Sequence, residues 1–413
     1  MHRILAVLSG CSLIVALLAA LPVTTASGTS CGPCAWGAPG SYGAVSGNSV
    51  RVLDTRTGLG GRLGAVAPGH TVTFDTDGSY ANISSAVIEV TVPDAPNGSL
   101  SVYPGGTAWN GRVTMTLVSG GPIQQQLTVP LSVDGDVTIR NNSARAVQLI
   151  VTVLGYYNAG TPTATGTFAA LNSRILDTRA TSPLPTNHKL TLRLPGHGGI
   201  PASGASAVVL NIAVLSARAN GLLSITDGDG SQATVHMRFV GNQTMQTERV
   251  VKVGSDGTLT FSQSSAAGVQ LVIDLMGYFL PYTPDVPDVN GSYVAESPQP
   301  ITALHDRQLR LYQHRPLDAD PPGISAYWAL AYNMVLTNDR PGQPALLGAY
   351  DPDYAWHPTV TVSSTPAGQT TELAIPPGLN QSTLTLENLT GAQWTYLHGF
   401  VTGYYWYFHC ANC

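Results

Sequence analysis

Charged residues are scarce in this sequence. They make up 10% of the 413 residues, the net charge is −5, and only two lysines, Lys189 and Lys252, accompany seventeen arginines. Proteins that bind nucleic acid present a basic patch or stripe to the phosphates, and this composition offers none. We therefore expect no nucleic acid among the partners of this protein.

The motifs of common catalytic and metal sites are absent or out of place. There is no H-E-x-x-H, phosphate-binding loop or G-x-G-x-x-G. Gly28-Thr29-Ser30-Cys31-Gly32 has the letters of a nucleophile elbow but lacks the flanking strand and helix. Asp227-Gly228-Asp229-Gly230 resembles the start of a calcium loop without the later oxygen ligands, which favours a hairpin tip. The sequence predicts no catalytic residue, no cofactor and no metal ion.

Long apolar runs are absent after the first residues. The run from Ile4 to Leu21 follows a basic start and precedes small residues ending at Ala26, which predicts a cleaved signal peptide over 1–26. A lipoprotein signal is the alternative, because the residues that end at Cys11 fit a lipobox. No later run approaches the ~20 apolar residues that cross a bilayer. We expect a secreted, extracellular protein, either free or associated with the cell surface, without a membrane span in the mature chain.

Four cysteines remain after the signal, and all lie in the two tails: Cys31, Cys34, Cys410 and Cys413. An even number of cysteines in an exported protein favours disulfides. A zinc site shared by the two C-x-x-C pairs and a redox centre are the alternatives. The pairing within a tail, between tails or between molecules stays open. Our hypothesis is that tails at opposite ends of a row of domains join subunits head to tail into a fibre.

The chain contains a repeat with recognisable opening and closing segments. Arg51-Val52-Leu53-Asp54-Thr55-Arg56 and Gly155-Tyr156-Tyr157 bound the first copy, and Arg174-Ile175-Leu176-Asp177-Thr178-Arg179 and Gly277-Tyr278-Phe279 bound the second. The separation is 102 residues from Asp54 to Tyr156 and 101 from Asp177 to Tyr278. A constant separation marks one folded unit that is repeated.

A third, divergent copy follows the second. Leu304-His305-Asp306-Arg307 replaces the opening segment, Phe400 occupies the position of Asp274, and the copy closes on Gly403-Tyr404-Tyr405. We place Tyr332-Asn333-Met334 at the position of Leu210-Asn211-Ile212. Such divergence suggests that the last copy has a separate role.

Alternation of apolar and polar residues, clearest over 147–153, predicts strands, and helical periodicity is absent after the signal. Turn pairs such as Asp134-Gly135 and Asp256-Gly257 precede further strand-like segments. We predict an all-β protein of three tandem β-sandwich domains, Ig-like or jelly-roll-like. The boundaries are a flexible tail at 27–40, repeats at 41–157, 167–280 and 291–409, linkers at 158–166 and 281–290, and a C-terminal CxxC at 410–413.

These segments resemble a tandem-repeat domain of exported bacterial proteins. That domain opens on R-V-L-D-T-R, carries L-N-V-x-V and G-x-L-x-V-Y-P strands, and closes on D-x-x-G-Y-F. Arg174 to Arg179, Leu210 to Val214, Gly221 to Thr226 and Asp274 to Phe279 carry the match in the second copy. The resemblance implies all-β, non-catalytic surface or extracellular modules and brings no assigned ligand.

The repeated Asp and Arg have two interpretations. Asp54 with Arg56, and Asp177 with Arg179, have the residue types of a catalytic acid beside an anion clamp. A structural bond that fixes a strand end is the interpretation we favour, because each copy needs such a bond and a single active site would need no copying. Tyr156 and Tyr278 belong to the same repeated structural motif.

Aromatic residues gather in the third copy. A predicted hairpin tip there carries Tyr350, Asp351, Asp353, Tyr354 and Trp356. Exposed aromatic groups are costly without a partner, and sugar rings stack on such platforms. This tip is our candidate carbohydrate-binding site.

The sequence as a whole favours a non-catalytic structural or adhesion protein outside the cell, cross-linked through its terminal cysteines. The first alternative is a module that binds cell-wall or environmental glycans through the third copy. The second alternative is a secreted glycan hydrolase, for which no pair of carboxylates stands out. The expected partners are a second copy of the protein or a cell-wall glycan.

Overall fold

The computed structural model describes two stretches of the chain in different detail. Residues 38–44, 50–76, 82–119, 122–215, 217–227, 235–281 and 291–300 are described almost continuously. Beyond them the described residues are the strand segments 307–310, 314–318, 329–338, 345–350, 359–362, 370–375, 383–388 and 394–406. No α-helix occurs among these residues, so the predicted all-β class is confirmed.

The strands fall into three consecutive sets. Unit one (42–158) contains β1 (Tyr42–Ala44), β2 (Val50–Asp54), β3 (Thr71–Asp75), β4 (Ile83–Val92), β5 (Gly98–Pro104), β6 (Met115–Leu117), β7 (Ile123–Pro130), β8 (Asp136–Asn141) and β9 (Ile150–Asn158). Unit two (168–279) contains β10 (Phe168–Asp177), β11 (Lys189–Arg193), β12 (Ala207–Leu215), β13 (Gly221–Asp227), β14 (Val235–Phe239), β15 (Met245–Lys252), β16 (Thr258–Gln263) and β17 (Gln270–Phe279).

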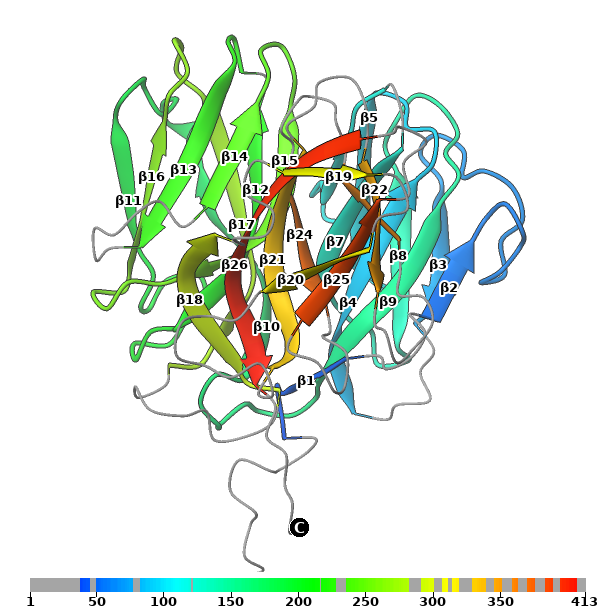
Figure 1. Ribbon diagram of the computed structural model, residues 1–413, viewed down its shortest axis with the longest axis horizontal. Coiled ribbons are helices and arrows are strands. Elements are labelled where there is room, and N and C mark those ends of the chain that lie inside the picture. Colours follow the sequence, from blue (N-terminus) through cyan, green and yellow to red (C-terminus); the bar gives the residue numbers. More distant parts are fainter. Residues whose placement is uncertain are drawn as a thin grey trace, which may run out of the picture.

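Unit three (293–406) repeats this order. Its strands are β18 (Tyr293–Pro300), β19 (Arg307–Arg310), β20 (His314–Asp318), β21 (Ala329–Asn338), β22 (Ala345–Tyr350), β23 (Thr359–Val362), β24 (Thr370–Ile375), β25 (Thr383–Asn388) and β26 (Trp394–Trp406). Figure 1 shows units one and two on either side of the molecule, with the strands of unit three across both.

Each unit is an antiparallel jelly roll. In unit two, one sheet has the order β10-β17-β12-β15 and the other has the order β11-β16-β13-β14. The first strand therefore pairs with the last, and the chain alternates between sheets except at the central hairpin, as in a jelly roll. Units one and three show the same order, with β2 and β19 as extra partners of the closing strands β9 and β26. Of the two predicted sandwich types, the topology is the jelly roll.

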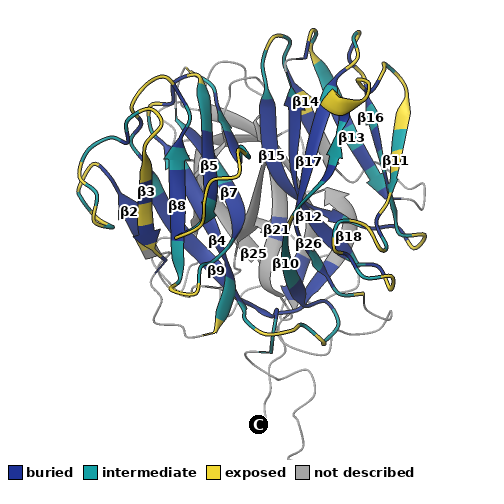
Figure 2. Ribbon diagram, turned by 180° about the vertical axis from the view of Figure 1, so that it is seen from behind, coloured by how far each residue is buried: buried dark blue, intermediate teal, exposed yellow. Residues whose placement is uncertain are grey.

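Units one and two each have a core of their own between their two sheets. The sheet that contains the opening and closing strands of a unit is called the inner sheet, because its second face is also buried. Figure 2 shows the inner strands β4 and β12 almost wholly buried, whereas β3 and β11 of the outer sheets alternate or are exposed. Burial of both faces means that the inner sheets pack against one another.

Six aromatic residues, called the axial cluster, hold the three units together: Tyr42, Tyr157, Phe168, Phe279, Tyr293 and Tyr405. They stack in three pairs, and each pair joins the closing strand of one unit to the opening strand of the next. The ring centroids of Tyr157 and Phe168 lie 4.2 Å apart, and those of Phe279 and Tyr293 lie 4.5 Å apart. The third pair, Tyr405 and Tyr42 at 4.1 Å, joins unit three back to unit one.

Backbone hydrogen bonds follow the same cycle. The amide of Phe168 donates to the carbonyl of Gly40 at 2.8 Å, and the amide of Tyr293 donates to the carbonyl of Gly166 at 2.8 Å. The amide of Tyr42 donates to the carbonyl of Gly291 at 2.9 Å and completes the cycle. The three units are therefore arranged in a closed ring with approximate threefold symmetry.

This ring corrects the expectation of a row of domains with tails at opposite ends. Tyr42 in the first described strand and Tyr405 in the last stack on each other, so the described chain begins and ends at the same place on the ring. A head-to-tail fibre linked through opposite ends does not fit this arrangement. The four cysteines themselves lie outside the described residues, as do 282–290 of the second expected linker.

The strand register of unit three corrects a second expectation. Asn333 pairs with Gly403 across β21 and β26, as Val209 pairs with Gly277 across β12 and β17. Asn333 thus takes the position of Val209, two residues before the expected position of Asn211. The bulge after Asn333 puts Val335 opposite Phe400, so Phe400 does occupy the position of Asp274.

Candidate functional site

The repeated Asp and Arg form the same local bonds in both units. Asp177 accepts hydrogen bonds from the backbone amide of Arg179 at 3.1 Å and from its side-chain Nε and Nη2 at 2.8 and 2.5 Å. Asp54 accepts the same three bonds from Arg56. The Arg179 side chain lowers the pKa of Asp177 to about 2, so this carboxyl is ionised at neutral pH and holds no proton to donate.

The threonine between this Asp and Arg joins the opening segment to the closing strand. Thr55 Oγ1 donates to the side chain of Gln148 at 2.5 Å and accepts the amide of Leu149 at 2.9 Å. Thr178 makes the matching bonds with Gln270 and with the amide of Leu271. These contacts give the D-T-R segment a structural task in each unit.

The closing G-Y-[FY] segment is explained by the axial cluster. The Tyr156 side chain belongs to the core of unit one and its hydroxyl donates to the carbonyl of Thr76, and Tyr278 packs against the core of unit two. The next aromatic residue along each strand points the other way, to the axis. A Cβ at Gly155 would overlap the ring of Tyr42, and one at Gly277 would overlap the ring of Phe168. Glycine is therefore required where the opening aromatic ring lies on the closing strand.

A third repeated segment was missed in the sequence. A G-[ST]-[YF] tripeptide opens each unit, at spacings of 126 and 125 residues: Gly40-Ser41-Tyr42, Gly166-Thr167-Phe168 and Gly291-Ser292-Tyr293. The three glycines have φ values of +75°, +69° and +78°, and the cyclic hydrogen bonds pass through them. The repeat of G-[ST]-[YF] was the signal that could have revealed the ring.

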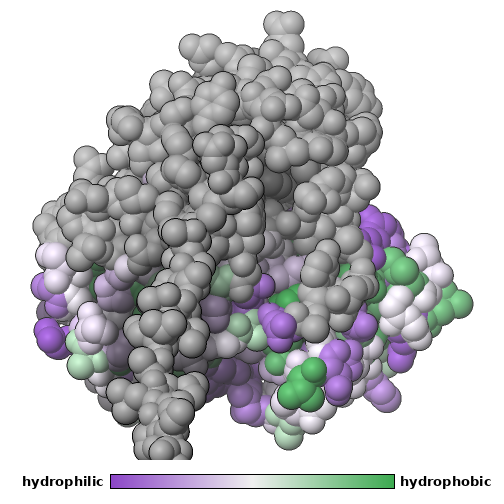
Figure 3. Space-filling view, turned by 90° about the horizontal axis from the view of Figure 1, so that it is seen from below, coloured by the Kyte–Doolittle hydropathy of each residue, from purple (hydrophilic) through white to green (hydrophobic). Residues whose placement is uncertain are grey.

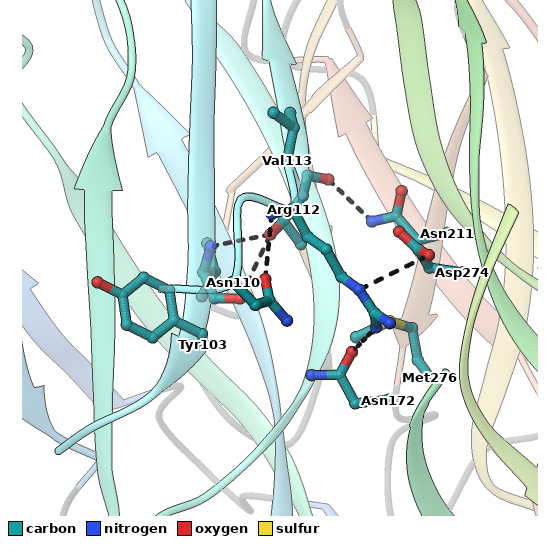
Figure 4. A pocket seen from close by; sticks show the side chains of 10 residues that line it. Tyr103, Asn110, Arg112, Val113, Asn172, Asn211, Asp274 and Met276 are labelled. Atoms are coloured by element: carbon teal, nitrogen blue, oxygen red, sulfur yellow. Dashed lines mark hydrogen bonds and ion pairs between the residues drawn. The ribbon is translucent and has the colours of Figure 1, made fainter. Parts of the chain in front are cut away.

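A cleft lies where unit one meets unit two, and we call it the inter-unit cleft (Figure 4). Unit one contributes Tyr103 at the end of β5 and the loop from β5 to β6. Unit two contributes the inner strands β10, β12 and β17. The lining residues at this end are Val102, Tyr103, Asn110, Arg112, Val113, Thr114, Asn172, Asn211, Asp274 and Met276.

The loop from β5 to β6 is fastened to unit two by hydrogen bonds. Asn211 Nδ2 donates to the carbonyl of Thr114 at 2.9 Å, and Gln246 Nε2 donates to the carbonyl of Val113 at 2.5 Å. Arg112 Nη1 donates to Asn172 Oδ1, and its Nε lies 4.0 Å from Asp274 Oδ1. The cleft is thus a fixed surface built by two units.

A second cavity, of about 310 Å³, shares the lining residues Val113 and Asp274 with this pocket and lies beside the D-T-R segment of unit two, and we count it as part of the inter-unit cleft. Its lining is polar and cationic, with Ser99, Thr116, Arg174, Arg179, Gln246 and Asp274 among glycine and aliphatic residues. Arg174 binds both oxygens of Asp274, from Nε at 2.8 Å and from Nη2 at 3.0 Å. The lining carboxylate is therefore neutralised by a bidentate arginine.

An exposed aromatic residue, Trp109, lies on the loop from β5 to β6, next in sequence to the cleft residue Asn110. Trp109 is 41% exposed, and its Nε1 donates to the carbonyl of Arg112 and to Ser101 Oγ, both at 3.1 Å. The guanidinium of Arg140 lies 4.4 Å from its ring centroid. The indole is thereby held in one orientation next to Asn110 and Arg112. In the view from below in Figure 3, the described part of the surface mixes hydrophilic and hydrophobic residues.

The remaining candidate residues fall at the limits of the described chain. Asp227 is buried at the end of β13, and no group of three metal-ligating side chains occurs in the described part. Tyr350 ends β22, whereas Asp351, Asp353, Tyr354 and Trp356 lie outside the described residues. Among the residues placed here, no helix is long and apolar enough to cross a membrane.

Sequence analysis found the aromatic segment of unit three but not its counterpart in unit one. The two segments share residues at the same spacing. Unit one has Tyr103, Ala108-Trp109 and Val113-Thr114, and unit three has Tyr350, Ala355-Trp356 and Val360-Thr361. Each segment connects two paired antiparallel strands, β5 with β6 and β22 with β23. The repeat with a period of 247 residues was the signal that could have directed attention to Trp109.

Comparisons with known proteins give distant structural likenesses only. No family model and no curated protein sequence matches the chain. It is similar to a turret protein with a triple jelly-roll fold from an archaeal virus, at 12% identity over 89% of this chain and 90% of that one, with a TM-score of 0.20. It is also similar to a structure of Sulfolobus Turreted Icosahedral Virus, at 12% identity over 89% of this chain and 91% of that one, with a TM-score of 0.20.

A third likeness is to the tandem CBM22 domains of Paenibacillus barcinonensis Xyn10C. It has 8% identity over 57% of this chain and 100% of that one, with a TM-score of 0.19. Likenesses at such TM-scores carry no argument about what this chain does.

Proposed function

We propose that this protein is a secreted, non-catalytic adhesion protein that binds glycans in the inter-unit cleft. The observation that carries the proposal is the loop from β5 to β6, which carries the exposed Trp109 and also brings Asn110 and Arg112 to the polar groups of unit two that line the cleft. Planar amides, guanidinium groups and an aromatic face match the hydroxyls and apolar faces of sugar rings.

The size and chemistry of the cleft support this proposal. The cavity of about 310 Å³ is at the small end of ligand sites, which favours one or two sugar rings. Glycoside hydrolysis needs two carboxyl groups on opposite sides of the scissile bond. Asp274 is the one carboxylate among the described lining residues, and Arg174 holds both of its oxygens. This supports binding rather than hydrolysis.

The test is glycan binding by the full mature chain. We expect retention on polysaccharide or cell-wall material and a loss of about tenfold in affinity for Trp109→Ala, which is about 1.4 kcal/mol. Leu63→Ala is the matched control, because Leu63 is also an exposed apolar residue, at 73%, and lies between β2 and β3 rather than on the loop from β5 to β6. Unchanged binding by Trp109→Ala would remove the cleft as the site.

Unit three carries a second candidate site for the same function. The segment with Tyr350, Asp351, Asp353, Tyr354 and Trp356 repeats the spacing of the unit one loop. If both segments bind glycans, Trp109→Ala and Trp356→Ala each lower retention, and the double variant abolishes it. Full retention by the double variant would contradict both sites.

A further inference from the structure

The inter-unit cleft has a charge opposite to that of the whole protein. Three guanidinium groups, those of Arg112, Arg174 and Arg179, border it, and the carboxylates beside them are Asp177 and Asp274. Three positive and two negative charges leave a surplus of one positive charge, whereas the whole chain has a net charge of −5. A cationic cleft on an anionic protein attracts anions from solution.

Two of the three arginines keep donors that the protein does not use. Each guanidinium nitrogen of Arg174 already donates to a carboxylate, Nε and Nη2 to Asp274 and Nη1 to Asp177. Arg179 uses Nε and Nη2, and Arg112 uses Nη1 as a hydrogen-bond donor. Arg179 Nη1 and Arg112 Nη2 therefore make no hydrogen bond to any residue that the structure describes. They come from different units and face the same cleft.

The arginines are also fixed before a ligand arrives. Bonds to Asp177 hold the guanidinium of Arg179, and contacts with Asn172 and Asp274 hold that of Arg112. A planar guanidinium held in place loses little conformational entropy when it binds a carboxylate. The nearest lining carboxylate, Asp274, repels a ligand anion weakly because Arg174 neutralises it.

We propose that the glycan bound in the inter-unit cleft is acidic, with a carboxylate received by Arg179 in the cavity. This inference rests on the proposed function and adds the class of ligand: a saccharide of one or two rings that carries a uronic acid or a similar carboxylate. The hydroxyl groups of Ser99 and Thr116 receive the sugar hydroxyls. The neutral groups bind any sugar, and the arginines select the acidic one.

The repeat provides a matched control for the test. Arg56 makes with Asp54 the same three bonds that Arg179 makes with Asp177, and it is similarly exposed, at 45% against 54%. Arg56 does not line the cleft. Arg56→Gln and Arg179→Gln therefore remove the same structural ion pair, but only the second removes a cleft donor.

The experiment measures binding of the full mature protein to an array of acidic oligosaccharides, each beside its carboxyl-reduced, neutral counterpart. We expect the acidic form to bind at least tenfold tighter, with the difference shrinking as salt is raised. Arg179→Gln should lose at least tenfold for the acidic form and little for the neutral one, and Arg179→Lys should lose less. Arg56→Gln should bind like the wild type.

The outcomes separate this inference from the proposed function. Equal binding of acidic and reduced forms, or equal effects of Arg179→Gln and Arg56→Gln, would overturn the acidic ligand and leave glycan binding in place. Absence of binding to every acidic, reduced and neutral glycan would overturn both. Circular dichroism of each variant shows whether a loss of binding reflects a loss of fold.

Discussion

Glu89 makes the stability of the ring depend on pH. It lies in β4, on the face of the inner sheet that points away from the core of unit one, and it is 3% exposed. Burial raises the pKa of Glu89 from 4.5 to about 8. The hydrogen bond with Gln124 and the charge of Arg51 lower this pKa, but their effect is smaller than that of burial. The folded protein therefore holds this carboxyl protonated at neutral pH, whereas the unfolded chain ionises it.

The sign and the size of the effect follow from the two pKa values. Because the folded state binds the proton more tightly, Glu89 favours folding fully below pH 4.5, and this contribution is lost as pH rises through about 8. A difference of this size corresponds to about 5 kcal/mol, since one pKa unit is about 1.4 kcal/mol. Glu89→Gln keeps the shape and removes the titration.

The assay compares denaturant unfolding of wild type and Glu89→Gln between pH 4 and pH 9. We expect the variant to gain stability relative to wild type as pH rises, by several kcal/mol at pH 9 and by little at pH 4. Other titrating groups, such as Asp177, are common to both proteins and cancel in the difference. Parallel stability curves for the two proteins would refute the buried, protonated state of Glu89.

Three further predictions concern the ring. Gly277→Ala drives a Cβ into the ring of Phe168, so it should cost about 1–3 kcal/mol of folding stability and lower the thermal midpoint of unfolding. Gly43→Ala is the control, because an added Cβ there contacts nothing and the midpoint should not change. Equal midpoints for the two variants would contradict the stacking. Tyr405→Phe should lower the free energy of unfolding by about 1 kcal/mol, because it leaves the buried Tyr157 hydroxyl unpaired. The double variant Tyr157→Phe, Tyr405→Phe should recover most of this loss, as measured by chemical unfolding. Because the described chain begins and ends at one place on the ring, beside Tyr42 and Tyr405, the mature protein should have the mass of a monomer with and without reductant. Oligomers that reductant dissociates would favour covalent assembly between molecules.

The class of fold was predictable from the sequence, because alternation and turns report single strands. Alternation over 147–153 shows that one side of a strand is apolar, and this segment does contribute its apolar side chains to the core of unit one. The repeated D-T-R and G-Y-[FY] segments likewise marked the edges of each unit, because each ties the opening of the unit to its closing strand.

The ring was not predictable in the same way, because its buried interface is largely polar. The second face of the inner sheets carries Glu89, Gln124 and Gln126 in unit one and Asn211, Gln246 and Glu248 in unit two, all at most 9% exposed. In a sequence, polar residues at alternate positions indicate a face in water. Here the three polar residues of unit two are bonded to unit one, as when Glu248 accepts the amide of Thr128 at 2.6 Å. Period-2 patterns therefore concealed the contact between units.

The inter-unit cleft depends on residues that the repeat does not explain. The repeated residues have tasks within the fold: Arg56 and Arg179 hold an Asp, and the glycines accommodate aromatic rings. Thr152 in unit one and Phe400 in unit three take the place of Asp274, so this carboxylate serves only the junction of units one and two. Residues that differ among structurally equivalent junctions are not needed to close the ring, so Arg112 and Asp274 serve the cleft rather than the ring.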